Sequence, residues 1–171
     1  MRRPLVLAAL LLLPAALAAQ QPAAAPPPPP QPSYASDSAA IRLVVSRLFD
    51  GMRARDTSAM RALFHEPVAM RSVGWRQGTP VVEADGLEDW FNGISSAPAG
   101  LLLDERLGPP EIRVDGNLAM VWAYYEFYAG DTFSHCGVDS FQLGRTGGGW
   151  TILLLADSRR KQGCTPSLGK S

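Results

Sequence analysis

The sequence predicts an α+β domain in which helices pack against one face of a curved antiparallel (mixed) sheet. In the first part of the chain, apolar residues recur at helical spacing. From about residue 101 onward, the chain is instead rich in aromatic and branched residues, in short runs separated by Gly or Asp breaks. Helices followed by strands that short loops join are typical of an α+β domain with antiparallel neighbours.

Two helices are expected at the start of the domain. The first has Asp37 as its N-cap and one apolar face. That face consists of Ile41, Val44, Val45, Leu48, Phe49 and Met52. Asp56 is the expected N-cap of a second helix, which Pro67 should end.

The elements that follow are expected to be mostly strands. Residues 68–75 predict a first strand, a short strand lies around Val81, and a short helix spans 87–94. Turn signals then occur at residues 114–117, 129–131 and 146–149. The remaining strands should therefore form an antiparallel meander.

Residues 1–18 have the features of a secretory signal peptide. Arg2 and Arg3 precede an apolar run, and small residues at 16 and 18 suit signal peptidase. The run is too short and too rich in alanine for a good transmembrane helix. We therefore expect an exported protein, periplasmic or secreted, that does not associate with the membrane once the signal is removed.

Residues 19–36 form a linker rich in Pro and Ala. Nine of the fifteen prolines lie within the first 32 residues, and such a segment favours an extended polyproline conformation. Residues 37–171 remain for one domain of ordinary size. Basic and acidic residues number sixteen each, and without a basic run nucleic acid is a poor partner. The sequence predicts no cofactor and no metal site, because its two Cys and two His lack a short-spacing ligand motif.

Beyond these patterns, the chain resembles the nuclear-transport-factor-2-like (NTF2-like) superfamily. The resemblance rests on the first amphipathic helix, on the phrase ARDTSAMRALFHEPVAM and on the ending HCGVDSFQLGRTGGGWTILLLADSRRKQGC. Within the superfamily, the chain is similar to SnoaL-like proteins and to an exported bacterial branch that is labelled as lumazine-binding. This fold hosts isomerases, dehydratases, hydrolases and binding modules, so the resemblance leaves the function open.

The resemblance implies a conical pocket between the concave sheet face and the helices. An apolar pocket with aromatic walls suits a flat organic ligand, although the same aromatic residues could fill a core. The predicted ligand-binding residues are Trp75, Trp90, Trp122, Tyr124, His135, Phe141 and His65. For His65, an alternative role is to interact with the last carbonyl groups of the second helix.

Three residues are candidates for acid–base catalysis: His135, Asp139 and Glu126. His135 and Asp139 share a strand face but lie roughly 13 Å apart along a regular strand, too far to bond each other. His135 would need a partner from elsewhere, such as Asp157. Glu126 lies within a strand of aromatic residues. If it is buried, its raised pKa would suit a general acid or base. The preferred interpretation is instead an exposed Glu126 that pairs with Arg145 or Arg113 across strands.

Cys136 and Cys164 are the two cysteines. An even number of cysteines in an exported protein suggests a disulfide. This bond requires the tail after residue 157 to fold back onto the sheet.

Positions 152–156 are apolar throughout, so both faces of that strand should be covered. Helices can cover only one face, and we therefore expect a homodimer that forms through the sheet.

The sequence favours an exported domain that binds a small organic molecule and need not be an enzyme. A SnoaL-like acid–base enzyme, of the isomerase or dehydratase type, is the second hypothesis. A protein-interaction module whose cone is filled by its own side chains is the third. A cavity in which titratable groups converge would favour the enzyme.

Overall fold

The computed structural model describes residues 33–169. The predicted signal peptide and residues 19–32 of the predicted linker lie outside the described residues. The elements in chain order are α1 (Tyr34–Ala54), α2 (Thr57–Arg61), β1 (Phe64–Arg76), β2 (Thr79–Asp85), α3 (Leu87–Ser95), β3 (Leu103–Leu107), β4 (Glu111–Asp115), β5 (Leu118–Ala129), β6 (Thr132–Thr146) and β7 (Gly149–Arg160). This order confirms the α+β prediction.

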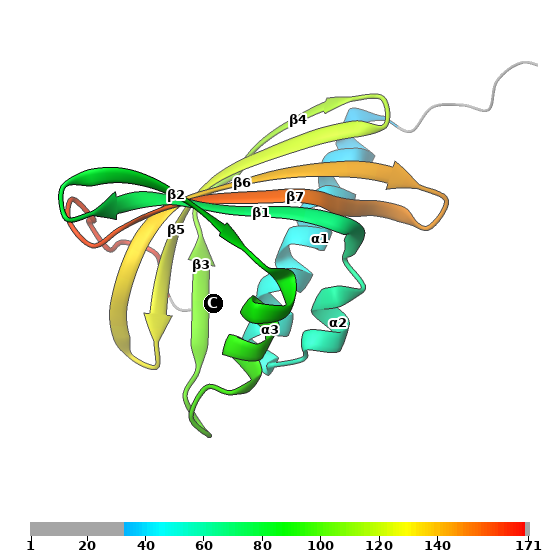
Figure 1. The fold of residues 1–171 in the computed structure, drawn as a ribbon. Helices are drawn as coiled ribbons and strands as arrows, with labels where there is room; N and C mark the ends of the chain where they lie inside the picture. The colour runs from blue at the N-terminus through cyan, green and yellow to red at the C-terminus, as the bar shows by residue number, and fades with distance from the viewer. Residues whose placement is uncertain (1–32, 170–171) are drawn as a thin grey trace, which may run out of the picture. The chain divides into compact units, whose positions relative to one another are not determined.

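The strands form one curved, mixed sheet in the order β2-β1-β7-β6-β5-β3, and β4 pairs with the other end of β5. Neighbouring strands are antiparallel except β1 and β7, which are parallel. The three helices lie on one side of this sheet, its concave face (Figure 1). The face without helices is the convex face.

Helix α1 begins earlier than the sequence predicts. Its N-cap is Ser33, whose side chain accepts a hydrogen bond from the Ser36 backbone, so residues 34–36 belong to the helix and not to the linker. Two tertiary contacts hold this extra turn. The Tyr34 hydroxyl donates to the Ile112 carbonyl at 2.8 Å, and Asp37, the expected N-cap, is buried and pairs with Arg145 at 2.5 Å.

The second helix is shorter than expected. Asp56 caps it as predicted, accepting a hydrogen bond from the Ala59 backbone at 2.9 Å, but the helix ends at Arg61. Strand β1 begins at Phe64 and contains Pro67, which the sequence pattern assigned to a helix end. Parallel pairing with β7 explains the difference, since Phe64 pairs with Ile152 in the sheet.

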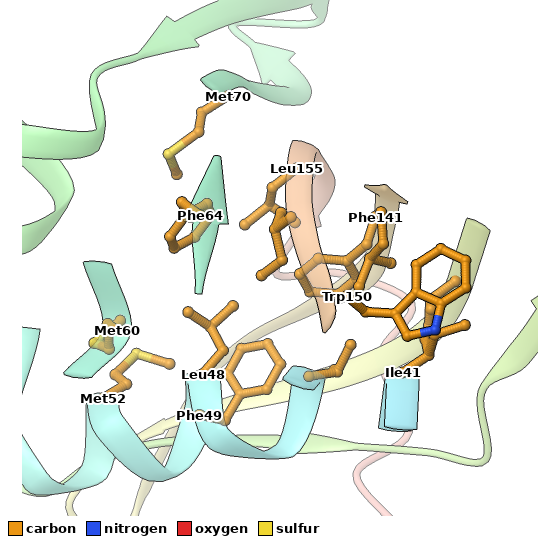
Figure 2. Close-up of a cluster of buried hydrophobic side chains, with 14 of the residues drawn as sticks. Ile41, Leu48, Phe49, Met52, Met60, Phe64, Met70, Phe141, Trp150 and Leu155 are labelled. Atoms are coloured by element: carbon orange, nitrogen blue, oxygen red, sulfur yellow. The ribbon is translucent and has the colours of Figure 1, made fainter. Parts of the chain in front are cut away.

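The core lies between α1 and the concave face (Figure 2). The predicted apolar face of α1 is buried there: Ile41, Val45, Leu48, Phe49 and Met52 are almost inaccessible to solvent. Phe49 meets Phe141 of β6 edge to face, with ring centroids 6.3 Å apart. Trp150, Ile152 and Leu155 complete the sheet side. Each such side chain contributes roughly 1.5–3 kcal/mol to folding.

The convex face carries a buried carboxylate, Glu126, which is 0% exposed. The preferred interpretation of Glu126, an exposed residue paired with an arginine across strands, is therefore wrong. Its carboxylate accepts hydrogen bonds from the backbone of Ser167 at 2.7 Å and of Leu168 at 3.2 Å, and from the Tyr128 hydroxyl at 3.0 Å. Glu126 thus binds the C-terminal tail to the sheet, and it lies on the face opposite the helices.

The same tail carries the predicted disulfide. Cys136 of β6 and Cys164 are bonded, and their Cα atoms are 5.9 Å apart. Arg106 adds to the attachment, since it lies over the Tyr128 ring, 3.7 Å from its centroid, and donates to the Leu168 carbonyl.

The remainder of the convex face is more open. Trp122 is 49% exposed there, and Leu153, Leu154 and Ala156 of β7 are partly exposed. The homodimer through the sheet stays a prediction. No helix within residues 33–169 is long and apolar enough to cross a bilayer.

Removal of the disulfide should destabilise the domain. The bond spans 28 positions, and the loss of such a loop constraint corresponds to about 3 kcal/mol in the chain-entropy model. We expect the Cys136→Ala/Cys164→Ala double variant to unfold at a lower urea concentration than the oxidised wild type. Reduced wild type serves as the control and should match the variant. An unchanged unfolding midpoint in both would contradict a stabilising role for the bond.

Candidate functional site

A cavity of about 260 Å³ opens on the concave face where the helices leave the sheet uncovered. Its walls come from α1, β1, β2, α3, β3, β5, β6 and β7. The lining residues are Phe49, Met70, Arg71, Ser72, Asp85, Gly86, Asp89, Trp90, Glu105, Tyr125, Asp139, Leu155, Asp157 and Arg159. One part of the wall is apolar, and the remainder is rich in carboxyl groups.

Two carboxyl groups, Glu105 and Asp139, meet at this cavity. Glu105 shares its face of β3 with Leu103 and Leu107, and Asp139 lies on the concave face of β6. Their side chains are within hydrogen-bond reach of each other. Asp139 is 3% exposed, and no donor group among the described residues bonds its Oδ2. Because two carboxylates repel when both are ionised, we infer that the pair holds one proton between them.

The surroundings raise the pKa of both groups. For Glu105, burial raises the pKa to about 7; the hydrogen bond with Asp139 opposes this, and the charge of Asp157 adds to it. For Asp139, burial and the neighbouring Glu105 hold the pKa well above its usual value. Arg159 acts against these shifts in both cases. Glu105 therefore titrates near neutral pH, which suits proton transfer.

Tyr125 crosses the sheet to reach a third carboxyl group. From β5 its ring passes over Gly137 of β6, and its hydroxyl reaches β7, 3.1 Å from Asp157 Oδ2 and 3.1 Å from the Ser158 carbonyl oxygen. Only glycine fits beneath the ring, since a Cβ atom at Gly137 would lie 2.7 Å from Tyr125 Cε1 and 1.6 Å from the Ser158 oxygen. Burial also raises the pKa of the Tyr125 hydroxyl, which keeps it protonated.

Ser72 of β1 joins Asp157 to a fourth carboxyl group. Its hydroxyl lies within hydrogen-bond reach of Asp157 Oδ1 and is 2.8 Å from Asp85 Oδ2. A serine hydroxyl has one hydrogen and can donate to only one of these acceptors at a time. The cavity therefore offers more acceptors than donors.

Few of the predicted ligand-binding residues lie in this cavity. Trp90 does, and Phe141 is buried in the core beneath it. Side chains alternate between the two faces along β5, and this alternation places Trp122 and Tyr124 on the convex face. His65 is exposed on β1, and it lies in none of the described pockets.

Trp75 and His135 line a wider groove between the β1–β2 hairpin and the end of β7, which adjoins the cavity and shares Ser72, Asp85 and Arg159 with it. Burial lowers the pKa of His135 to about 4, so the ring is neutral at pH 7. Within the described residues its only hydrogen bond is with Ser134, at 3.0 Å. His135 and Asp139 therefore form no dyad, as the strand spacing predicts.

Sequence reasoning named Asp139 but missed Glu105 and Tyr125. The alternation of side chains along residues 103–107 could have identified Glu105. It shares a strand face with two leucines and is therefore a lone carboxylate on an apolar face. Alternation along β5 likewise places Tyr125 with Val121 and Ala123 on the concave face. In contrast, Ser72, Asp85 and Asp89 gave no signal, because only the fold brings them together.

Comparison with known families assigns the fold. The model of the SnoaL-like domain matches residues 33–155. This chain belongs to the SnoaL-like domain family. The match covers every residue that lines the cavity except Asp157 and Arg159, which lie just beyond its end on β7. The exported branch labelled as lumazine-binding stays a prediction.

Solved structures support the same fold for this SnoaL-like domain. An NTF2-like protein of unknown function from Shewanella baltica is 17% identical, with a TM-score of 0.59, over 77% of this chain and 100% of that chain. A candidate dehydratase of the NTF2-like family from Streptomyces avermitilis is 17% identical, with a TM-score of 0.60, over 75% and 99%. Identities this low show the fold alone. A search of curated proteins finds no match.

The Gly137→Ala variant should disturb the cavity of this SnoaL-like domain. The added Cβ would overlap the Ser158 carbonyl oxygen and crowd Tyr125, so we expect roughly 2 kcal/mol or more of destabilisation in urea unfolding. Gly93→Ala is the matched control. Its Cβ meets nothing within 4 Å on helix α3, and it should stabilise the domain slightly. Equal stability of both variants would argue against the described path of Tyr125.

The Asp139→Asn variant should change how stability depends on pH. The pKa of Glu105 is about 7 in the folded chain against an ordinary value of 4.5. Glu105 therefore contributes its full share to the stability of the folded state below about pH 4.5. This contribution is lost as the pH rises through about 7. The variant removes Asp139, whose pKa in the folded chain is held well above its usual value, and with it the loss of stability that this group causes as the pH rises. We expect its free energy of unfolding, relative to wild type, to rise by roughly 1–3 kcal/mol between pH 5 and 8.

Asp115→Asn, at an exposed turn, is the control for this pH series and should parallel the wild type. Urea unfolding at each pH provides the measurement. A constant difference between Asp139→Asn and wild type across the range would contradict a raised pKa in the pair.

Proposed function

We propose that this domain binds a small, partly apolar organic molecule in the concave cavity and transfers a proton on it, as in isomerisation or dehydration. The observation that carries the proposal is the pair of carboxyl groups, Glu105 and Asp139, that lie within hydrogen-bond reach of each other at the cavity wall. The pKa of about 7 for Glu105 gives both protonation states at neutral pH. The candidate dehydratase among the structural neighbours is compatible with this chemistry.

The pair contains a general base and a general acid at once. In an isomerisation, the ionised member would take a proton from a carbon atom next to a carbonyl group, and the pair would return a proton to another carbon. In a dehydration, the base would take the C–H proton while the protonated member gives its proton to the departing hydroxyl, which leaves as water. The protons balance in both cases, and the pair regains its starting state.

The remaining residues would position the substrate. Phe49, Met70 and Leu155 offer an apolar surface for its body. The protonated Tyr125 hydroxyl and Ser72 hold Asp157 in place, and this fixed negative charge keeps the pKa of the neighbouring pair raised. The volume of about 260 Å³ supports an open pocket over a filled cone, and it suits a molecule of modest size.

We also propose that the protein is exported and dimeric. The bond between Cys136 and Cys164 is compatible with an oxidising compartment. The partly exposed apolar residues on the convex side of β7 are the surface on which a second copy would pack.

Hydrogen exchange with solvent tests the proposed activity without knowledge of the substrate. A small-molecule extract of the host organism is incubated with the protein in D₂O and analysed by mass spectrometry. We expect compounds that gain deuterium, or that lose the mass of water, only with the wild type. The Asp139→Asn and Glu105→Gln variants should slow that change at least 100-fold, the lower range of general acid–base effects.

His65→Gln is the matched control, because His65 is exposed on β1 and lines neither the cavity nor the groove that holds His135, and it should retain the activity. Compounds that bind to wild type and both variants without any exchange would contradict proton transfer and favour the binding module.

A further inference from the structure

The charge of the cavity suggests which class of ligand it takes, on the premise, shared with the proposed function, that the cavity is the ligand site. Five carboxyl groups line it, against two guanidinium groups. Even with one proton shared by Glu105 and Asp139, the wall carries an excess of negative charge. A pocket of this kind repels anionic ligands and attracts cationic ones.

The two arginines offset only part of this charge. Arg159 pairs with Asp157 at 3.4 Å, and Arg71 donates to the carbonyl oxygen of Met70 at 2.6 Å. Within residues 33–169, none of the other four carboxyl groups of the cavity belongs to an ion pair. These four carboxyl groups outnumber Arg71, the one lining arginine that is not paired with a carboxylate among the described residues.

The inner end of the cavity provides an independent observation. Asp139 is 97% buried, and no donor group among the described residues bonds its Oδ2. A buried carboxyl oxygen without a donor is unfavourable unless a partner arrives. The shared proton can serve only one oxygen of the pair at a time. A hydroxyl or N–H group on a ligand would supply the missing donor at this end.

The mouth of the cavity combines negative charge with an aromatic face. Asp85 ends β2, and Asp89 and Trp90 lie in the first turn of α3, so the chain brings them close together. Trp90 stacks on Phe91 with ring centroids 5.6 Å apart, which fixes its orientation. The dipole of α3 takes up part of the charge of Asp89, but Asp85 precedes the helix. Carboxylates beside an indole ring are a favourable environment for an ammonium group.

We propose that the ligand of this cavity is a small organic cation with a hydroxyl group. Its ammonium group lies at the mouth, beside Asp85, Asp89 and Trp90. Its apolar body lies against Met70 and Leu155, and its hydroxyl end reaches the Glu105–Asp139 pair. The hydroxyl group is then placed where the pair can protonate it or remove a neighbouring proton.

Three probes of matched shape test the proposal: choline, its neutral isostere 3,3-dimethylbutan-1-ol, and the anion 3,3-dimethylbutanoate. Binding to the folded protein is followed by the NMR signal of the Trp90 indole N–H, which the Trp90→Phe variant assigns. We expect choline to bind at least tenfold more tightly than the neutral alcohol, and the anion not to bind. Added NaCl should weaken choline binding, because salt screens charges at the exposed mouth.

Variants at the mouth provide the second measurement. Asp85→Asn and Asp89→Asn should each weaken choline binding about three- to tenfold and leave the affinity for the neutral alcohol unchanged. Asp115→Asn, which removes a carboxylate on the β4–β5 turn, is the matched control and should bind choline as wild type does.

Three outcomes would overturn the proposal: equal or tighter binding of the neutral alcohol, binding of the anion, or failure of all three probes to shift the Trp90 signal. These results are separate from the deuterium exchange experiment, which depends on Glu105 and Asp139. Exchange that needs the pair, together with a preference for the neutral probe, would overturn the cationic ligand and leave the proposed function intact.

Discussion

The packing of helix α1 on the concave face of the sheet is the contact on which the other features depend. Leu48, Phe49 and Met52 fill the space above the middle of the sheet. The helix lies over only part of the curved sheet, however, and the uncovered part becomes the cavity. Phe49 belongs to both regions, since it packs on Phe141 and also lines the cavity. One apolar helix face thereby sets the boundary between core and pocket.

Buried carboxyl groups occur on both faces of this sheet, and each face stabilises them differently. On the convex face, Glu126 accepts backbone and hydroxyl hydrogen bonds, and it holds the C-terminal tail. On the concave face, no donor group among the described residues bonds Asp139 Oδ2, and burial together with neighbouring carboxyl groups raises the pKa of both Glu105 and Asp139. The first arrangement suits a fixed structural role. The second leaves a group that can release and accept protons, which is why the concave pair is the better candidate for chemistry.

Strand alternation explains why segment 133–141, which contains His135, Cys136 and Asp139, divides between three roles. Alternate side chains of a strand face opposite sides, so Cys136 points to the convex face and bonds the tail. Asp139 points into the cavity, while His135, on the same side, lies further along in the adjoining groove. Residues that are adjacent in the sequence thus serve the tail attachment, the candidate site and a neighbouring surface.

The sequence by itself determined the α+β class, the apolar face of α1, which side chains of β5 and β6 share a face, and the disulfide. Periodic patterns and a pair of cysteines can be recognised in the sequence without knowledge of the tertiary structure. It also named Asp139. Only the tertiary structure decided that Glu105 is the partner of Asp139, and that the tail covers Glu126. These contacts join strands distant along the chain, and their energies depend on burial and on neighbouring charges, which exist only once the sheet has curved around α1.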